Sequence, residues 1–408
     1  MNIWIINPYG ELPSGKWREY RSYMLAKELV ESGHSVSWWI SNFDHRTKTF
    51  REASETEAVC VGAQLNIFSV PCIAYDKNIS LRRILYEVKF GRELYKIAQT
   101  QIKPDLIVLA YPAIFTGGPI FKLKKELSVP LILDVIDLWP ELFSVVLPRL
   151  LKRFSRIIFF PLYWLRKKQV QASDGIVAVS KDYLEVSKNE AMSNVQSQVV
   201  YWGLNSNTDH NMPLDQAIDD RVTSFRQRFD LVAVYAGTLG DAYDMDLLLS
   251  ASDYCDKNGI SIGFIVAGNG PRFSDFQSHD RFTDNLCFLG ILPANQLSAL
   301  YSFCDVGLIT YVPGSTVAMP IKFFDYLGAG IAILNCLGRD VGALTISEGV
   351  GLNFEASNML DFIDKLKVFS KDRALLGSCQ TASKTISKKY DVKTQYGLFR
   401  EFIETYER

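Results

Sequence analysis

The sequence predicts an α/β protein built from two Rossmann-like, doubly wound parallel sheets, each in a domain of its own. Short apolar runs alternate with longer segments of helical periodicity along the whole chain, a pattern typical of parallel strands joined by crossover helices. The chain has 408 residues, which is more than one hydrophobic core usually accommodates. The alternation also restarts once, after a polar stretch, and this restart indicates the second domain.

The first domain is expected over residues 1–205. Its predicted strands are residues 3–6, 35–40, 65–70, 106–110, 131–135, 175–179 and 198–202. No basic segment precedes the first apolar run, so we interpret that run as a strand and not as a signal peptide. The first helix is predicted over residues 20–32 and ends at Gly33, because glycine readily adopts the left-handed conformation found at helix ends.

The second domain is expected over residues 229–380. Residues 206–228 are polar, rich in Asn and Asp and without apolar periodicity, which predicts an interdomain linker. The strands predicted after it are residues 231–236, 261–267, 285–288, 306–309, 332–335 and 351–354. Residues 381–408 are predicted to be helical, with Tyr396, Phe399 and Phe402 at helical spacing.

Composition excludes several classes of protein. The formal net charge is −1, so no global charge favours nucleic acid. The seven cysteines are scattered without a C-x-x-C pair, which favours a reducing, cytoplasmic location over a disulfide framework or a zinc site. No run approaches the ~20 apolar residues that cross a bilayer.

Polar and glycine-rich loops follow several predicted strands, where open α/β sheets bind ligands. In the first domain, the loop of residues 7–15 ends at Gly15 and is either a ligand loop or a plain turn. Asp134, Asp137 and Glu141 lie at or just beyond the end of another strand. Asp137 is either a site residue or a helix cap.

In the second domain, glycines follow two consecutive strands and predict room for a nucleotide or its phosphates. The residues concerned are Gly237, Thr238 and Gly240 after the first strand, and Gly268 and Gly270 after the second.

Residues 319–330 give the most specific prediction. Pro320 and Ile321 mark a helix start, which places Lys322 in the first turn. A cation there opposes the helix dipole unless an anion is present. Lys322 therefore either forms an intrahelical ion pair with Asp325 or binds a diphosphate while Asp325 accepts hydrogen bonds from ribose.

Residues 149–168 combine basic and aromatic side chains and contain no acid. Basic residues are attracted to anionic lipid and aromatic residues favour the membrane interface, so this stretch predicts peripheral association with an anionic membrane. The alternative is that its apolar residues pack inside the first domain.

Several stretches together carry a resemblance to a known family: residues 26–36, 103–105, 137–141, 173–180, 268–271 and 322–330. In these stretches the sequence resembles retaining family-4 glycosyltransferases of bacterial polysaccharide assembly. The resemblance implies the GT-B architecture: two Rossmann-like domains facing a central cleft, a donor site in the second domain and a C-terminal helix that crosses back to the first. It also implies a nucleotide-sugar donor, UDP- or GDP-linked, and a glycan or lipid-linked acceptor.

The sequence departs from the family pattern at particular positions. Asp325 and Val317 stand where the family usually has glutamates, and Thr238 stands where it has a basic residue. By the resemblance, Lys322 together with Arg272 would neutralise the diphosphate, and Asp137 would orient the acceptor hydroxyl. The family's catalytic histidine has no clear match.

No cofactor or metal is expected, because Asp244 and Asp246 have D-x-D spacing but fall at a helix start where capping is typical. His34 is interpreted as structural, and His45, His210 and His279 receive no chemical role. Two other functions stay open: a GT-B sugar-nucleotide epimerase and a non-catalytic partner subunit.

Overall fold

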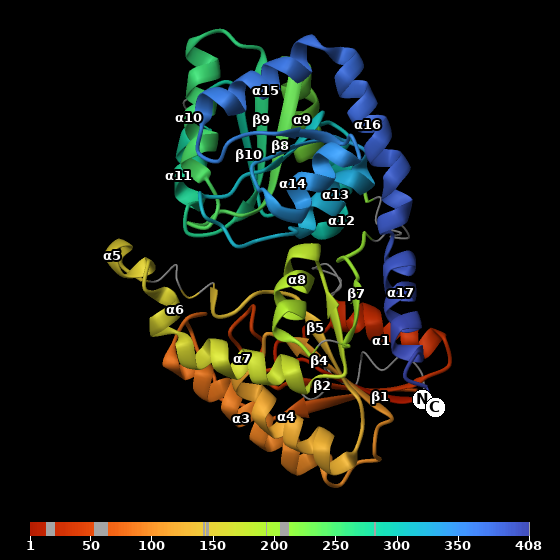
Figure 1. The fold of residues 1–408 in the computed structure, drawn as a ribbon. Helices are drawn as coiled ribbons and strands as arrows, with labels where there is room; N and C mark the ends of the chain where they lie inside the picture. Colours follow the sequence, from red (N-terminus) through yellow and green to blue (C-terminus); the bar gives the residue numbers. More distant parts are fainter. Residues whose placement is uncertain are drawn as a thin grey trace. The chain divides into compact units, whose positions relative to one another are not determined.

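The computed structural model describes residues 1–13, 21–52, 64–141, 143, 147–192, 194–204, 212–280 and 283–407. These residues form two compact units (Figure 1). Unit 1 is Met1–Tyr201 with Gln395–Arg408, and unit 2 is Trp202–Thr394. Each unit is an α/β layer structure around its own parallel sheet, as the sequence predicts.

Unit 1 contains a seven-stranded sheet in the order β3-β2-β1-β4-β5-β6-β7, with all neighbours parallel. The strand order reverses between β1 and β4, which makes the carboxyl ends of these strands the expected ligand-binding edge. The strands are β1 (Asn2–Ile6), β2 (Ser35–Ser41), β3 (Leu65–Val70), β4 (Leu106–Tyr111), β5 (Leu131–Val135), β6 (Gly175–Ala178) and β7 (Gln196–Val199).

The helices between the strands of this unit are α1 (Arg21–Glu31), α3 (Leu81–Ala98), α4 (Ile114–Leu127), α5 (Arg149–Lys152), α6 (Ser155–Ile158), α7 (Phe160–Ala172) and α8 (Lys181–Glu190). Of these, α5 and α6 project away from the sheet (Figure 1). The last helix, α17 (Val392–Glu404), also packs on unit 1. It buries Tyr396 and Phe399, and Arg400 forms an ion pair of 3.2 Å with Glu28 of α1.

Unit 2 contains a six-stranded parallel sheet in the order β10-β9-β8-β11-β12-β13. Its order reverses between β8 and β11. The strands are β8 (Leu231–Thr238), β9 (Ile262–Asn269), β10 (Leu286–Gly290), β11 (Val306–Ile309), β12 (Ala332–Asn335) and β13 (Gly351–Asn353). The helices are α9 (Gln216–Arg226), α10 (Met245–Lys257), α11 (Phe273–His279), α12 (Ala294–Tyr301), α13 (Ile321–Ala329), α14 (Arg339–Ser347), α15 (Met359–Lys371) and α16 (Arg373–Ser387), followed by the 3-10 turn η3 (Lys388–Tyr390).

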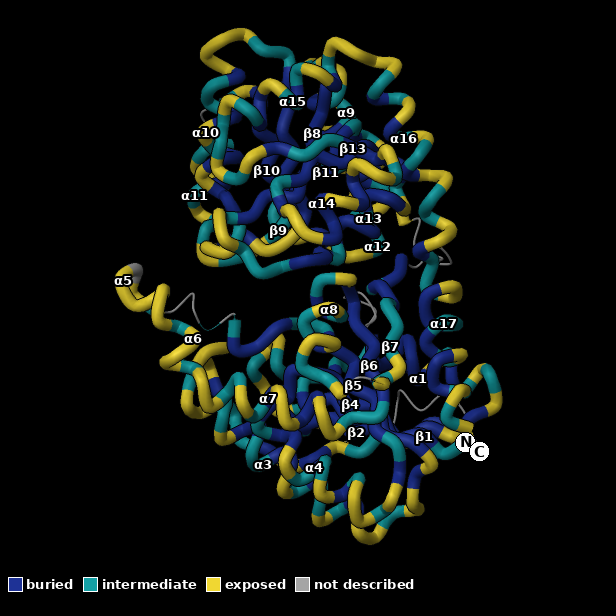
Figure 2. The backbone as a smooth tube through the Cα atoms, viewed as in Figure 1, coloured by how far each residue is buried: buried dark blue, intermediate teal, exposed yellow. Residues whose placement is uncertain are grey.

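The strands form the buried centre of each unit, and the outer helix faces are exposed (Figure 2). Buried parallel strands are apolar on both faces and therefore appear in the sequence as continuous apolar runs. The predicted strands match the observed ones closely for this reason. The largest difference is at β7, predicted at residues 198–202 and observed at Gln196–Val199.

Two segments differ from the expected domain boundaries. Residues 206–228, predicted as a linker, contain helix α9, which buries Val222 and Phe225 against unit 2. Within residues 381–408, the end of α16 belongs to unit 2, and only the part from Gln395 groups with unit 1. Two buried residues on an otherwise polar helix were too weak a signal of periodicity to reveal α9.

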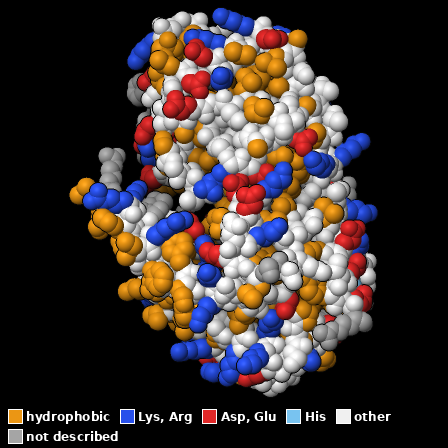
Figure 3. Space-filling model, in the orientation of Figure 1, with side chains coloured by type: hydrophobic (Ala, Val, Ile, Leu, Met, Phe, Trp, Pro, Cys, Tyr) orange, Lys and Arg blue, Asp and Glu red, His pale blue; other side chains and the backbone are white. Residues whose placement is uncertain are grey.

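The α5–α7 segment exposes most of its apolar side chains, and hydrophobic and basic side chains gather over it (Figure 3). Leu150, Ile157 and Phe160 are 80%, 74% and 63% exposed. The alternative in which these residues pack inside the domain is therefore wrong. No helix within the described residues is both long and apolar enough to cross a membrane.

Candidate functional site

The candidate site of unit 2 lies at the carboxyl ends of β8 and β9 and at the first turn of α13. Pro320 is the N-cap residue of α13 and provides no side-chain cap, and the first turn contains no acid. The first N–H groups of a helix have no intrahelical partner, so this end presents free donors and a partial positive charge. Both favour an anion at this position.

Lys322 places an amino group that can carry a positive charge at the same position. Its side chain is buried, with 9% of the residue exposed, and its Nζ has no hydrogen-bond partner within the described structure. The ammonium group instead lies over aromatic rings, 3.8 Å from the ring centre of Tyr235, 5.0 Å from that of Tyr243 and 5.9 Å from that of Tyr311. Lys322 therefore does not form the intrahelical ion pair with Asp325 that was the structural alternative.

Burial lowers the pKa of Lys322 to about 7, opposed by the nearby charge of Asp325. Burial in an apolar site disfavours the charged form of a lysine. The ammonium is therefore only partly protonated at neutral pH, and an anion brought beside it would raise its pKa. Perturbed groups of this kind cluster at functional sites.

Different structural constraints require glycine at the positions along this edge of the sheet. A Cβ at Gly268 would lie 1.8 Å from the backbone oxygen of Gly237, and one at Gly270 would lie 2.3 Å from that of Leu239. Gly268 and Gly270 are thus required where the ends of β8 and β9 pack together, and they do not open space for a ligand. A Cβ at Gly237 would make only an ordinary contact of 3.4 Å with the Nζ of Lys322, and it is the φ of 146° that favours glycine at this position.

The remaining predicted donor residues surround the same turn. Thr238 is exposed, and its backbone oxygen accepts a hydrogen bond of 2.7 Å from the Tyr235 hydroxyl. Gly240 is buried beside it, with only ordinary contacts around a hypothetical Cβ. Ile321 and Asp325 are half-buried on α13, on either side of Lys322. The structure thus brings Gly237, Thr238 and Lys322 together.

Arg272 is less suited to the predicted role. Its guanidinium pairs with Asp246 at 2.6 Å and also with Asp275. A diphosphate would have to compete with two carboxylates, so we leave Arg272 out of the proposed site.

The two aspartates with D-x-D spacing have separate structural partners. Asp244 caps α10, since its Oδ1 accepts from the Leu247 N–H at 3.1 Å, while Asp246 pairs with Arg272. No cluster of three or more potential metal ligands occurs among the described residues.

The three carboxylates after β5 in unit 1 also have different roles. Asp134 is buried in an ion pair with Arg21, and Glu141 pairs with Arg166 at 2.6 Å. Asp137 is half-buried, and its Oδ1 accepts from the N–H of the next residue, Leu138, at 2.8 Å. Its carboxylate is also hydrogen-bonded to the side chain of Trp139. Burial raises the pKa of Asp137 to about 6, a shift of the kind found at functional sites. Gly15, predicted to contact the donor, lies outside the described residues.

Sequence reasoning missed the tyrosines around Lys322. Tyr235, Tyr243 and Tyr311 come from three separate segments, and no spacing in the sequence links them. Tyr235 lies within β8, Tyr243 follows β8 and Tyr311 follows β11, the two strands between which the strand order of unit 2 reverses. The sequence also gave no role to His45, which the structure places among charged and aromatic side chains of unit 1.

Comparison with solved structures decides the fold. Anabaena HepE in complex with UDP superposes with a TM-score of 0.70 at 11% identity, covering 99% of this chain and 100% of that chain. Sucrose-phosphate synthase from Thermosynechococcus elongatus gives 0.71 at 13% identity, covering 99% of both chains. The chain has the GT-B fold. A Rickettsia africae glycosyltransferase is also similar, with a TM-score of 0.63 at 12% identity over 99% of this chain and 98% of that chain.

These GT-B neighbours cover both units, so the fold extends over the entire chain. No protein-family model and no curated protein sequence matches it. HepE has also been solved in complex with UDP-glucose.

Proposed function

We propose that this GT-B protein transfers a sugar from a UDP- or GDP-linked donor to a glycan or lipid-linked acceptor in bacterial surface polysaccharide synthesis, as a retaining enzyme without a metal ion. The observation that carries the proposal is the buried, unpartnered ammonium of Lys322 beside the N-terminus of α13. A buried cation is costly unless an anion compensates it. A nucleoside diphosphate is such an anion, and the GT-B neighbour HepE binds UDP and UDP-glucose.

In the transfer, the bond between the anomeric carbon and the diphosphate oxygen breaks, and its electron pair goes to the leaving diphosphate. The acceptor hydroxyl oxygen forms the new bond on the same face of the sugar, and its proton goes to the leaving diphosphate. Negative charge on the diphosphate grows as the bond breaks, so Lys322 and the first N–H groups of α13 stabilise the transition state more than the ground state. Asp325 accepts from the ribose hydroxyls, and Asp137 of unit 1 orients the acceptor hydroxyl.

In the free protein the Nζ of Lys322 rests against the ring of Tyr235 and is closed to solvent. Donor binding therefore requires the ammonium to leave the ring face and meet the diphosphate. The tyrosine faces hold the cation while no anion is present, because an aromatic face attracts a cation. This arrangement supplies the charge without a metal.

The proposal is tested with thermal-shift measurements against UDP, GDP, ADP and dTDP, because a ligand that binds only the native state raises its apparent stability. We expect a shift with UDP or GDP in excess chelator, and transfer from the matching nucleotide sugar with retained anomeric configuration. Absence of binding by all four nucleotides would overturn the donor site. Turnover that stops in chelator and returns with manganese or magnesium would overturn the metal-independent mechanism.

Peripheral membrane association is part of the same proposal. The exposed α5–α7 segment has basic side chains beside its apolar ones and no acid, a combination that suits an anionic lipid surface. A lipid-linked acceptor would explain such a surface. Co-sedimentation with phosphatidylglycerol vesicles is expected, with loss of binding in Ile157→Ser/Phe160→Ser. Equal recovery in the supernatant with anionic and neutral vesicles would contradict it.

A further inference from the structure

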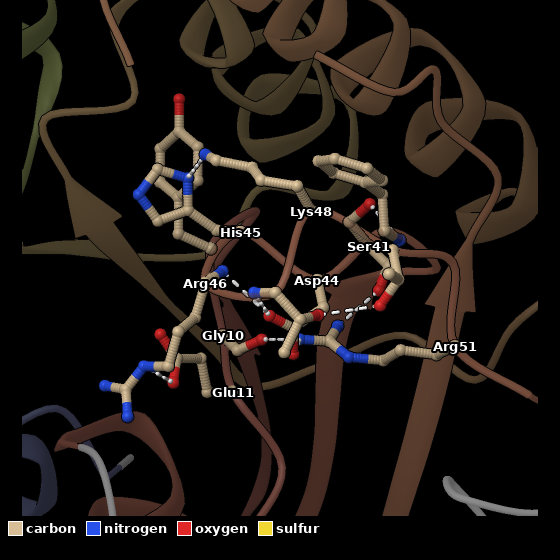
Figure 4. A network of polar contacts seen from close by, with 12 residues as sticks. Gly10, Glu11, Ser41, Asp44, His45, Arg46, Lys48 and Arg51 are labelled. Atoms are coloured by element: carbon tan, nitrogen blue, oxygen red, sulfur yellow. Dashed lines mark hydrogen bonds and ion pairs between the residues drawn. The ribbon is translucent and has the colours of Figure 1, made fainter. Parts of the chain in front are cut away.

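A second group of cations without a direct ion pair in the described structure lies in unit 1, at the loop that follows β2. Lys48 is half-buried there, and its Nζ donates to Asn78 Oδ1 at 2.7 Å and lies 4.3 Å from the ring centre of Tyr75. Figure 4 shows the side chain of Lys48 extending to the ring of His45, with Nζ 3.4 Å from Nδ1. No carboxylate pairs with Lys48 within the part of the chain that the structure describes.

Arg83, in the first turn of α3, lies beside Lys48. Its guanidinium stacks over Tyr9 and Trp139, 4.6 and 4.3 Å from their ring centres. Its NH1 donates at 2.6 Å to the backbone oxygen of Asn78, whose side chain accepts from Lys48. Asn78 thus holds both cations near each other. Arg83 also forms no ion pair with a carboxylate among the described residues. Its Nε donates at 2.9 Å to the Tyr9 hydroxyl, which in turn donates to the Glu87 carboxylate.

The neighbouring cations of the same network are all paired. Arg46 pairs with Glu11 at 3.1 Å and Arg51 pairs with Asp44 at 3.1 Å (Figure 4). Lys48 and Arg83 therefore differ from the other cations of this network, because they form no ion pair with an acid. A cation held partly out of water without an acid is stabilised when an anion binds.

The N-terminus of α3 adds further positive charge. This helix of 18 residues has no acid in its first turn, which instead carries Arg82 and Arg83. Cations at this end oppose the helix dipole, and an anion there relieves the conflict. Only the Ser80 side chain, which accepts from the N–H of Arg83 at 3.2 Å, caps the helix.

His45 adds a neutral donor to this group. Burial, followed by the charges of Lys48 and Arg83, lowers the pKa of His45 to about 3, so the ring is neutral. Its Nδ1 faces the Tyr75 hydroxyl and the Lys48 ammonium, which are both donors. The proton therefore belongs on Nε2, which makes no hydrogen bond within the described structure and is not among its buried unsatisfied atoms.

The backbone of the loop is held in an unusual conformation at the same position. Lys48 has a φ of 60°, in the left-handed region that residues other than glycine rarely adopt. The Asp44 carboxylate fixes the turn by accepting from the N–H groups of Arg46 and Thr47 at 2.7 and 2.9 Å. Strain that is maintained in this way is commonly found at binding sites.

We propose that Lys48, Arg83 and the Nε2–H of His45 form a binding site in unit 1 for a phosphate group carried by the acceptor sugar. This inference rests on the proposed function, because it names a chemical feature of the acceptor. The three groups are donors without acidic partners, and a phosphate monoester provides the oxygens and the negative charge that they lack. Lys48 and Arg83 bind the phosphate, and this fixes the position of the attached sugar.

The histidine signals of the protein provide a direct test. The chain has four histidines, so protein labelled with ¹³C-histidine gives four ring signals, and the His45→Gln variant assigns one of them. We expect glucose 1-phosphate, added at constant ionic strength, to shift the His45 signal in a saturable way, and glucose to leave it unchanged. Lys48→Met and Arg83→Gln should each weaken this binding by roughly tenfold or more.

Arg92→Gln is the matched control, because it removes an exposed arginine from the same helix and should leave the binding unchanged. The other histidine signals report whether each variant keeps its fold. An unchanged His45 signal, or equal affinity in Lys48→Met and wild type, would overturn the site. Inorganic phosphate that binds as tightly as glucose 1-phosphate would overturn its assignment to the acceptor.

The donor site is read out separately, by the UDP-dependent thermal shift of wild type and Lys322→Met. If glucose 1-phosphate shifts the His45 signal but no nucleotide binds, the phosphate site is supported and the proposed sugar transfer is excluded. If UDP binds but glucose 1-phosphate does not shift the His45 signal, the donor site is supported and the phosphate site in unit 1 is excluded.

Discussion

Unit 1 and unit 2 each bury a cation near the carboxyl edge of the sheet, Arg21 and Lys322, and these two cations differ in whether they have a partner. Arg21 of unit 1 is 4% exposed, and its Nε donates to both oxygens of Asp134 at 2.8 and 2.9 Å. Lys322 of unit 2 is 9% exposed and has no hydrogen-bonded partner in the described structure. A buried cation with a bidentate partner is part of the folded framework, whereas a buried cation without one is held ready for a ligand.

The largest expected effect is on stability, in Arg21→Met. This substitution leaves the Asp134 carboxylate buried and unpaired, which costs about 3–5 kcal/mol. Thermal unfolding should show a clearly lowered transition for unit 1. The double variant Arg21→Met/Asp134→Asn should recover part of the lost stability, because it removes the unpaired charge of the buried carboxylate. If the single variant unfolds like wild type, the pair does not belong to the framework.

Lys322→Ala should have the opposite signature, with turnover lost and stability kept. A charge-assisted hydrogen bond contributes ~1.5–3 kcal/mol, which corresponds to roughly 10–150-fold, and loss of a preorganised electrostatic partner can cost about 10²–10³ in turnover. Asp325→Asn should instead raise the donor KM more than it lowers kcat, since ribose contacts are similar in both states. Steady-state kinetics of the two variants distinguishes these roles. Near-wild-type turnover in Lys322→Ala would make it a structural residue.

The pH dependence of the free energy of unfolding measures how much the burial of the Lys322 charge destabilises the protein. Its pKa is lowered on folding, so between about 7 and the ordinary lysine value the unfolded chain binds a proton that the native protein does not. The stability of wild type relative to Lys322→Met should therefore rise as pH increases above 7 and be lowest below 7. Denaturant unfolding at pH 6, 8 and 9.5 measures this difference. A difference that is independent of pH would contradict the burial of a titrating ammonium.

Asp137→Asn should have a smaller, acid-side effect. The raised pKa of about 6 means that the Asp137 carboxylate is protonated in more acidic solution and loses its ability to accept from an acceptor hydroxyl. The kcat/KM profile of wild type should fall below pH 6. The variant should be slower at neutral pH and lack this limb. A limb that persists unchanged in Asp137→Asn belongs to another group.

The sequence predicted the strands well, but only some of the contacts at the candidate site. The strands of both units are buried on both faces, so local apolar runs suffice to find them. The conflict between Lys322 and the dipole of α13 could also be predicted, because it depends on neighbours in the sequence. Helix α9 could not, since its buried face consists of only Val222 and Phe225.

The partners of charged residues were harder to predict, because they come from distant segments. Arg272 was expected to bind the diphosphate, but Asp246, from another helix, pairs with it. The glycine pattern at the ends of β8 and β9 was interpreted as ligand space, whereas Gly268 and Gly270 are required by the close approach of the ends of these two strands. Close backbone packing and ligand binding both favour glycine, so a single sequence cannot distinguish the two.

The most direct test of Lys322 as the diphosphate cation compares Lys322→Met with wild type, with and without UDP and GDP. Lys257→Met, which removes an exposed lysine of unit 2, is the matched control. We expect unliganded Lys322→Met to be at least as stable as wild type, because the variant no longer buries a charge, and to lose the nucleotide-induced thermal shift that Lys257→Met keeps. A nucleotide-induced shift in Lys322→Met equal to that of wild type would show that Lys322 does not bind the diphosphate.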